Sequence, residues 1–273
     1  MVKLLLLVVL VLAVTSLVLL FRQHGLIYVP RPYDEDFLEN VSEWVKPLAF
    51  FASEGRQYAY YLGPAGSPQV LPERLWVMFG GNAGLALGWL SFLEGNPYER
   101  DGFLLIEYPG YGKNEGRASP GKNYESSESA LEALASHLGV KVSAFEGRLS
   151  VVGHSLGAAE ALEFASHHAA RRILLIAPFT SMHDMAVRAV GYPFCYLLLY
   201  RYDNIMTLRK LSRTNPKPRV VIFHGSDDGV VPVGMGRELA GIDSAMIEYV
   251  EVEGRGHDDI LEDAKRYFHT RIE

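Results

Sequence analysis

The fold is decided by the stretch Val151-Val152-Gly153-His154-Ser155-Leu156-Gly157-Ala158-Ala159. It contains the pattern Gly-x-Ser-x-Gly, which is typical of a sharp turn between a buried strand and a helix. Such a turn strains the backbone of the serine and places its hydroxyl above the edge of the sheet. Glycines are expected at 153 and 157 because side chains there would collide with the neighbouring strand and helix. Ser155 is therefore a candidate nucleophile, and the N–H of Leu156 points to where an oxyanion would form.

Short apolar runs alternate with helical patterns on both sides of this turn. We predict strands at 56–62, 75–79, 103–106, 148–152, 173–176, 220–223 and 247–252, and helices at 85–93, 125–138, 156–168 and 258–271. The first of these strands is expected at an edge of the sheet. Near-continuous Val, Ile and Leu runs indicate a mostly parallel sheet covered by helices on both faces. Ligands of such sheets bind at the carboxyl ends of the strands.

The N-terminal segment is strongly apolar. Between Leu4 and Phe21 the only polar residues are Thr15 and Ser16, and Lys3 and Arg22 bracket the run. This length fits a helix that spans a membrane, so we expect an uncleaved anchor. The alternative is a cleaved signal peptide, but the run is long for a signal and no Ala-x-Ala site follows it. The flanking charges do not set the orientation in the membrane.

The chain of 273 residues is long enough for one large domain. We assign residues 1–24 to the anchor, 25–48 to a linker and lead-in, and 49–273 to an α/β domain with a short apolar insert near 183–213. The formal net charge of −6 argues against nucleic acid as a partner. The single cysteine, Cys195, excludes an intrachain disulfide and is interpreted as a core residue.

A serine hydroxyl needs a base to accept its proton as it attacks. His257 lies in a glycine-rich loop between the last predicted strand and the last predicted helix, where its imidazole can reach the sheet edge. The base needs an acidic partner to fix its tautomer. The loop after the strand at 220–223 offers Asp227 and Asp228, and spacing alone does not choose between them.

A second oxyanion donor is expected in the loop Phe79-Gly80-Gly81-Asn82-Ala83-Gly84, which follows a predicted strand. The N–H of Asn82 or Ala83 would point into the site. A Gly-rich loop can also bind phosphate, but no Gly-Lys-Ser/Thr follows it, which disfavours a nucleotide site. The sequence has no Cys/His cluster with zinc spacing, so no metal and no cofactor are expected.

Four motifs together resemble the serine hydrolases of the α/β-hydrolase fold. They are Gly80-Gly81-Asn82-Ala83-Gly84, Glu107-Tyr108-Pro109-Gly110-Tyr111-Gly112, Gly153-His154-Ser155-Leu156-Gly157, and His224 to Pro232 with Gly256-His257. The resemblance covers residues 49–273. More narrowly, the chain is similar to the membrane-tethered α/β-hydrolase-domain proteins, a group that includes lysophospholipid lipases and protein depalmitoylases. Gly80 stands where that group usually has His, and Glu107 where it usually has Asp.

The resemblance implies a mostly parallel, doubly wound sheet preceded by a transmembrane helix. It implies a catalytic triad of Ser155, His257 and Asp228, with Asp227 as the second choice for the acid. It also implies that the oxyanion donors are Asn82 and Leu156. The expected reaction is hydrolysis of a carboxylic ester or thioester of an apolar, lipid-like acyl substrate through an acyl-enzyme, without a cofactor.

Substrate contacts are expected from Ala83, Tyr111 and Phe194. Tyr111 lies in a turn-rich loop that borders the pocket in relatives, and the alternative for this loop is a purely structural turn. Phe194 lies in the apolar insert Gly191–Tyr200, which fits a lipid-chain groove, contact with a membrane surface, or buried core. Two other functions use the same pattern: a serine peptidase of this fold, and a non-catalytic binding or scaffold protein.

Overall fold

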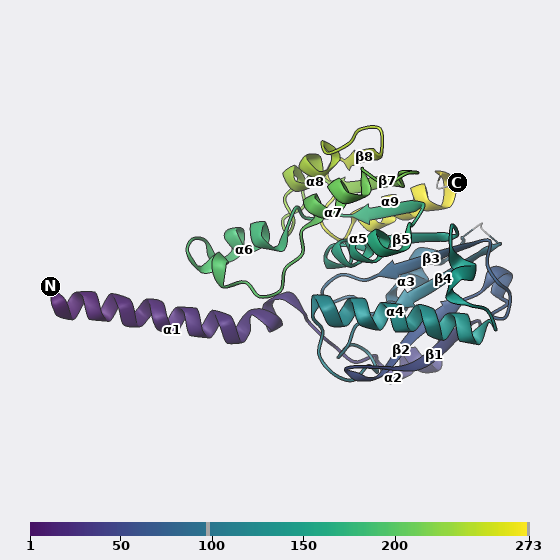
Figure 1. Ribbon diagram of the computed structural model, residues 1–273, viewed down its shortest axis with the longest axis horizontal. Coiled ribbons are helices and arrows are strands. Elements are labelled where there is room, and N and C mark those ends of the chain that lie inside the picture. The colour runs from purple at the N-terminus through teal and green to yellow at the C-terminus, as the bar shows by residue number, and fades with distance from the viewer. Residues whose placement is uncertain (97–98, 272–273) are drawn as a thin grey trace.

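The computed structural model describes residues 1–96 and 99–271 as an eight-stranded sheet with helices on both faces and a long helix that projects away (Figure 1). The strands lie in the order β1-β2-β4-β3-β5-β6-β7-β8. From β4 to β8 all neighbours are parallel, while β2 is antiparallel to both β1 and β4. The predicted fold class is therefore confirmed. Their bounds are β1 (Val45–Ala52), β2 (Gly55–Leu62), β3 (Arg74–Phe79), β4 (Asp101–Ile106), β5 (Leu149–His154), β6 (Arg172–Ile176), β7 (Arg219–Gly225) and β8 (Ile247–Val252).

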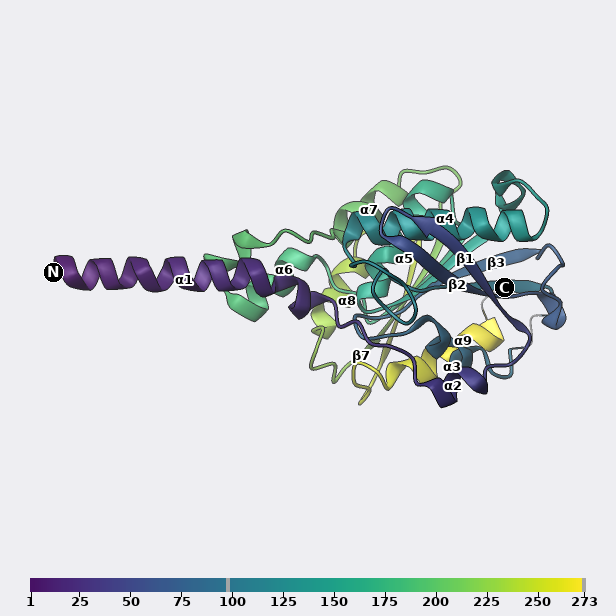
Figure 2. The same ribbon diagram turned by 90° about the horizontal axis from the view of Figure 1, so that it is seen from below.

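The helices divide between the two faces of the sheet. Figure 2 shows α4, α5 and α7 over one face, and α3 and α9 over the other. The projecting helix is α1, whose last turn leads directly into the domain. Their bounds are α1 (Val2–Ile27), α2 (Glu35–Glu39), α3 (Trp89–Leu93), α4 (Pro120–His137), α5 (Leu156–His168), α6 (Met182–Val190), α7 (Asn204–Leu211), α8 (Val233–Ala240) and α9 (Ile260–Arg271), with a short 3-10 helix, η4, at Phe194–Leu197.

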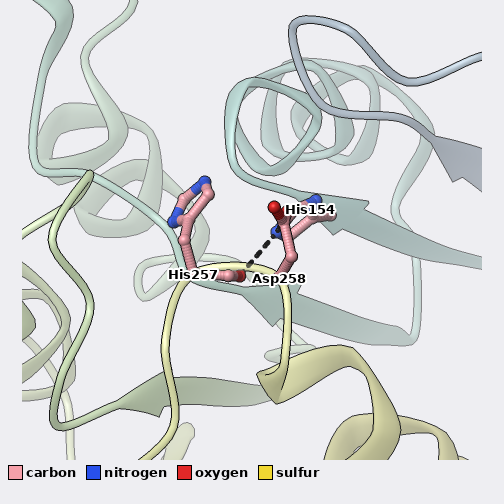
Figure 3. Close-up of side chains that lie close together, drawn as sticks. All are labelled: His154, His257 and Asp258. Carbon is pink, nitrogen blue, oxygen red and sulfur yellow. Dashed lines mark hydrogen bonds and ion pairs between the residues drawn. The ribbon is translucent and has the colours of Figure 1, made fainter.

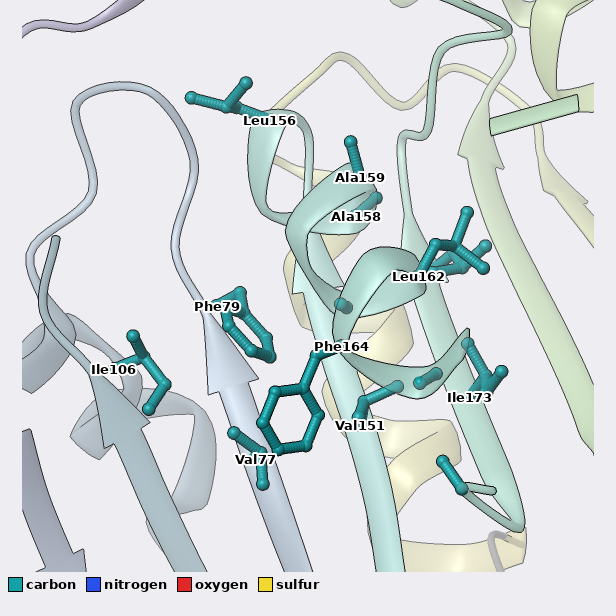
Figure 4. Packing of buried hydrophobic residues seen from close by; sticks show 14 of the residues in the cluster. Val77, Phe79, Ile106, Val151, Leu156, Ala158, Ala159, Leu162, Phe164 and Ile173 are labelled. Carbon is teal, nitrogen blue, oxygen red and sulfur yellow. The ribbon is translucent and has the colours of Figure 1, made fainter. Parts of the chain in front are cut away.

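Alternate side chains of each central strand enter opposite cores, as the pleat of a sheet requires. On β3, Val77 and Phe79 join the cluster beneath α5, where Phe79 and Phe164 have ring centroids 5.7 Å apart (Figure 4). Trp76 joins the opposite cluster, with its ring centroid 4.8 Å from that of Phe268 on α9. Burial on both faces holds α5 firmly against the sheet, and with it the turn between β5 and α5.

One strand was not predicted. Residues 45–52 form β1 at the edge of the sheet, so the strand that we expected there, β2, lies one position further in. Only Val45 and Leu48 of β1 are buried, a spacing of three that does not resemble the alternation of a half-buried strand. Pro47 also weakens the pattern, although an edge strand tolerates proline. The sequence signal was therefore too weak to identify this strand.

The linker that follows α1 packs into the domain. Tyr28 is fully buried, and its hydroxyl lies 2.7 Å from that of Tyr202 in the segment after η4. The hydroxyl of Tyr202 in turn donates a hydrogen bond to Glu160 on α5. The N–H of Val29 donates to the carbonyl oxygen of Asn82 at 3.0 Å. Residues just past the apolar helix are thus linked to the nucleophile helix through Tyr202 and bond the loop after β3 directly.

Burial of Glu160 makes the stability of this network depend on pH. Burial raises the pKa of its carboxyl to about 8, although hydrogen bonds from Tyr202 and Asn123 oppose the rise. Between about pH 5 and 8 the folded chain therefore holds a proton that the unfolded chain releases. The free energy of unfolding should fall as the pH rises through this window, by up to about 1.4 kcal/mol per pH unit.

A Glu160→Gln variant should flatten that decline, because glutamine has no proton to lose. Urea unfolding at pH 5 and pH 8 in one detergent measures the difference for the wild type and the variant. Glu132→Gln, at an exposed position on α4, is the matched control and should keep the slope of the wild type. Equal slopes for wild type and Glu160→Gln would show that Glu160 ionises normally.

Candidate active site

Ser155 lies in a strained turn between β5 and α5, with a backbone φ of 55°. The flanking glycines have no room for a side chain. A Cβ atom at Gly153 would lie 2.1 Å from the carbonyl oxygen of Gly157, and one at Gly157 would lie 2.1 Å from the carbonyl oxygen of Phe79. Close approach of the strand, the helix and β3 therefore requires both glycines and presents the serine at the carboxyl edge of the sheet.

Three side chains from distant loops meet at this edge. The Nε2 atom of His257 lies 2.9 Å from the Oγ atom of Ser155, and its Nδ1 atom lies 2.7 Å from Oδ2 of Asp228. The three residues follow β5, β7 and β8, whose carboxyl ends lie at one edge because the strands are parallel. With Nδ1–H donated to Asp228, the Nε2 lone pair of a neutral His257 faces the hydroxyl of Ser155.

Asp228 is held as a charged acceptor. Its Oδ1 atom accepts hydrogen bonds from the N–H groups of Val230 and Val231, each at 2.8 Å. Burial alone would raise the pKa of this carboxyl, but hydrogen bonds from His224, His257 and the backbone of Val231 outweigh it and hold the pKa well below its usual range. Asp227 is exposed and accepts from Ser226 instead, so the structure places only Asp228 beside His257.

His154 supports the loop that carries His257. Its Nε2 atom lies 3.1 Å from the backbone carbonyl oxygen of His257, and the two rings lie side by side (Figure 3). Burial, together with the nearby His257, lowers the pKa of His154 to about 4, so this ring is neutral at neutral pH and donates to that carbonyl. Both residues and Asp258 offer ligand atoms within 4.8 Å of one another. However, both ring nitrogens of His257 already face Ser155 and Asp228, which suits proton transfer better than metal ligation.

Two backbone N–H groups near Ser155 are free to bind an oxyanion. Within residues 1–96 and 99–271, neither the N–H of Asn82 nor that of Leu156 donates a hydrogen bond. Asn82 follows Gly81, where a Cβ atom would lie 3.6 Å from the Cβ of Ser155. Both residues line the cavity above the serine. Unpaired donors beside a nucleophile are the arrangement that stabilises a tetrahedral intermediate.

A model of the alpha/beta hydrolase family matches residues 76–214, which is half of the chain and includes both the loop after β3 and the turn at Ser155. The chain belongs to the alpha/beta hydrolase family.

Two curated proteins have sequences similar to that of this chain. An uncharacterized protein of Mycobacterium tuberculosis is 33% identical over 174 residues, which cover 61% of this chain and 59% of that protein. Human alpha/beta hydrolase domain-containing protein 17B is 26% identical over 155 residues, covering 56% of this chain and 49% of that protein. The chain thus spans about half to three fifths of the length of these relatives.

Solved structures share the fold over almost the whole chain. An alpha-beta hydrolase from Vibrio vulnificus superposes with a TM-score of 0.70 at 14% identity, covering 91% of this chain and 89% of that one. An esterase from Pyrococcus furiosus superposes with a TM-score of 0.62 at 15% identity, covering 88% and 94%. At these identities the likeness concerns the fold.

The alpha/beta-hydrolase site opens into a cavity of about 1450 Å³. Of the three expected substrate contacts, Ala83 and Phe194 line this cavity. Its other walls come from α1, the linker, α3, the segment α6–η4, and the loop that carries His257. Side chains from these walls include Leu19, Gln23, Leu26, Ile27, Tyr33, Phe37, Trp89, Phe92, Phe179, Met182, Met185, Val190, Leu197 and Leu198.

The expectation for Tyr111 needs correction. Its side chain is fully buried and is not part of the cavity wall. The hydroxyl of Tyr111 donates to the carbonyl oxygen of Asn82 at 2.5 Å and accepts from the N–H of Val29 at 2.9 Å. Tyr111 therefore fixes the peptide between Asn82 and Ala83, in the loop beside Ser155, instead of contacting substrate.

A Tyr111→Phe variant should hydrolyse esters with a kcat about 10-fold lower and a nearly unchanged KM. The lost hydrogen bond loosens the Asn82 loop, whose N–H matters most in the transition state. Steady-state kinetics on a short p-nitrophenyl ester measures both constants. Tyr61→Phe is the control, because it removes a buried hydroxyl that donates to Val70 far from the site. A higher KM with an unchanged kcat would contradict a positioning role for Tyr111.

Two features of the site were not predicted: the contact of His154 with the loop that carries His257, and the contribution of α1 to the cavity. For His224 the sequence favours a hydrogen-bonding role within its loop over a catalytic one, and in the structure its Nε2 atom lies 3.4 Å from Oδ2 of Asp228. The side chains of Leu19 and Gln23 on α1 also reach the cavity. A single sequence carries no signal for contacts between α1 and the distant residues around Ser155. The one available signal for His154 was its position next to Ser155 in the sequence.

Proposed function

We propose that this protein is a serine hydrolase that cleaves carboxylic ester or thioester bonds of apolar acyl substrates. The observation that carries the proposal is the chain of two hydrogen bonds from Asp228 through His257 to Ser155. The unpaired N–H groups of Asn82 and Leu156 support it, since they lie where a carbonyl attacked by Ser155 would develop negative charge. Family membership and the esterase among the structural neighbours agree with a hydrolase.

Acylation begins when the Oγ atom of Ser155 attacks the substrate carbonyl carbon and its proton passes to Nε2 of His257. Asp228, charged and buried, stabilises the resulting imidazolium through Nδ1–H. The N–H groups of Asn82 and Leu156 bind the oxyanion. The bond to the leaving alcohol or thiol then breaks, His257 delivers its proton to that group, and an acyl-Ser155 ester remains.

Deacylation repeats these steps with water. His257 removes a proton from water, the hydroxide attacks the acyl carbon, and the same two N–H groups bind the second oxyanion. Collapse of this intermediate releases the carboxylic acid, while His257 returns its proton to Oγ of Ser155. Every proton that the reaction moves passes through His257, so the residues already described suffice for the whole cycle.

Turnover of p-nitrophenyl esters by the full chain in detergent tests this function. We expect hydrolysis across a series of acyl chains and burst release of p-nitrophenol, because an acyl-enzyme accumulates. Aminoacyl arylamides serve as the second substrate class and should be cleaved much more slowly. Preferential cleavage of arylamides would favour a peptidase. If the protein hydrolyses no ester and is not labelled by a fluorophosphonate, only a binding role remains.

We also propose that α1 remains attached as a membrane anchor. Among the described residues, α1 is the one helix that is long and apolar enough to span a membrane. Its last turns pack into the domain, where Gln23 and His24 are buried and His24 bonds the carbonyl of Ala118 at 3.1 Å. Cleavage of a signal peptide would remove these contacts. The mass of protein extracted from membranes tests this, since the intact chain has a mass of 30.4 kDa.

A further inference from the structure

The cavity above Ser155 is walled partly by the membrane-anchor helix. Leu19, Gln23, Leu26 and Ile27 of α1 line it at successive spacings of four, three and one residue. These positions form one face of a helix, which is the face turned towards the domain. Opposite them, the cavity is lined by apolar side chains of the cap, which we define as residues 182–199, from α6 through η4.

The cap is fixed to α1 by a buried amide. Gln23 donates through Nε2 to the carbonyl oxygen of Leu197 at 3.4 Å and accepts from the N–H of Leu199 through Oε1 at 2.8 Å. Figures 1 and 2 both show α6 beside the C-terminal half of α1. The cap therefore lies alongside α1 as well as over the domain.

This arrangement sets the depth of the cavity in a bilayer. The apolar run of α1 ends at Phe21, and Arg22 follows it. Leu19 lies three residues before Arg22, about 4.5 Å further into the apolar run at the rise of an α-helix. If α1 spans the membrane, the cavity wall at Leu19 lies within the lipid-facing part of the helix, so this end of the cavity is at membrane level.

The outer surface of the cap fits the same placement. Tyr192, Tyr196 and Leu199 are each about two thirds exposed, at 65%, 65% and 68%. The rings of Tyr192 and Tyr196 lie next to each other, with centroids 5.8 Å apart. Tyrosines concentrate at the boundary between headgroups and acyl chains, where the ring is apolar and the hydroxyl is hydrated. The cap thus presents an interfacial surface beside the anchor.

We propose that the space between α1 and the cap is the entry path for the acyl chain of a bilayer lipid, which passes from the membrane to Ser155 without crossing water. The cap surface of Tyr192, Tyr196 and Leu199 rests in the headgroup region and holds the path at membrane level. This inference rests on the proposed function, since it assigns the origin of the acyl group that Ser155 attacks.

The path is tested by narrowing it at α1. Leu19→Trp should lower kcat/KM for a palmitoyl ester embedded in phosphatidylcholine vesicles, relative to a soluble butyryl ester, by about 10-fold or more. Val18→Trp is the matched control, because Val18 is exposed on another face of the helix and does not line the cavity. Its ratio should equal that of the wild type. An unchanged ratio in Leu19→Trp would overturn the proposed path.

A second measurement does not depend on catalysis. A Leu199→Cys variant carrying an environment-sensitive fluorophore should be quenched by brominated phosphatidylcholine, while the buried Cys195 remains unlabelled. The control is a label at Val70→Cys, which is exposed in a loop between β2 and β3 and should not be quenched. A water-exposed label at 199 would overturn the membrane placement, even if ester hydrolysis is intact. A quenched label in a protein without hydrolase activity would instead refute the proposed function.

Discussion

Replacement of Ser155 by alanine should lower kcat for ester hydrolysis by about 10⁵- to 10⁶-fold and abolish labelling by a fluorophosphonate. Without Oγ no covalent acyl-enzyme can form, and His257 is left without the hydroxyl that it activates at 2.9 Å. The remaining rate would come from binding and from the N–H groups of Asn82 and Leu156. Stopped-flow or long-time assays with p-nitrophenyl butyrate, and gel detection of the probe, measure the two effects.

The fold should survive this change, because alanine and serine have the same backbone restraint at a φ of 55°. A thermal midpoint close to that of the wild type therefore distinguishes lost chemistry from lost structure. Ser226→Ala is the control at the same sheet edge, since Ser226 bonds Asp227 and the N–H of Gly254 but not His257. Its labelling should be normal. Labelling that persists in Ser155→Ala would assign the nucleophile to another residue.

The turn at Ser155 could be predicted because its causes are local. Gly153, Ser155 and Gly157 are within five positions of one another, and the steric demand on both glycines follows from any strand that turns sharply into a helix. The strands that flank the site were also predictable, because strands buried on both faces consist almost entirely of apolar residues. Edge strand β1 lacked that signal, since only two of its residues are buried.

Other parts of the site depend on contacts that no local pattern encodes. Tyr111 was expected at the substrate because its loop borders the pocket in relatives, but the side chain turns inward to Asn82. Leu19 lines the cavity on the helix that Gln23 bonds to the cap at Leu199. These contacts join residues 29 and 176 positions apart. The sequence thus predicts which loops meet at the sheet edge, while the direction of each side chain follows from packing.

The choice between Asp227 and Asp228 illustrates this limit and provides the second large effect. Spacing leaves both carboxylates possible, and only burial separates them: Asp228 is 8% exposed and touches His257, whereas Asp227 faces solvent. Asp228→Asn should therefore lower kcat by about 10⁴-fold. An asparagine that presents its NH₂ to Nδ1 forces the proton onto Nε2, which then cannot accept the proton of Ser155.

Asp227→Asn is the matched control, because it makes the same chemical change one residue away and should alter kcat less than about 3-fold.

The pH dependence separates the two roles further. Hydrogen bonds hold the pKa of Asp228 well below its usual range, so its carboxylate stays charged at every pH at which activity is assayed. Its titration therefore does not lower the rate on the acidic side of the pH–rate profile. Stability should follow the same sign: a depressed pKa stabilises the folded chain above the ordinary pKa of Asp, and that contribution is lost only as the pH falls below it. Asp228→Asn should therefore unfold more easily than the wild type at pH 7, with the difference shrinking in strong acid. If Asp227→Asn loses activity and Asp228→Asn keeps it, the orienting acid is the exposed carboxylate and His257 must rotate to reach it.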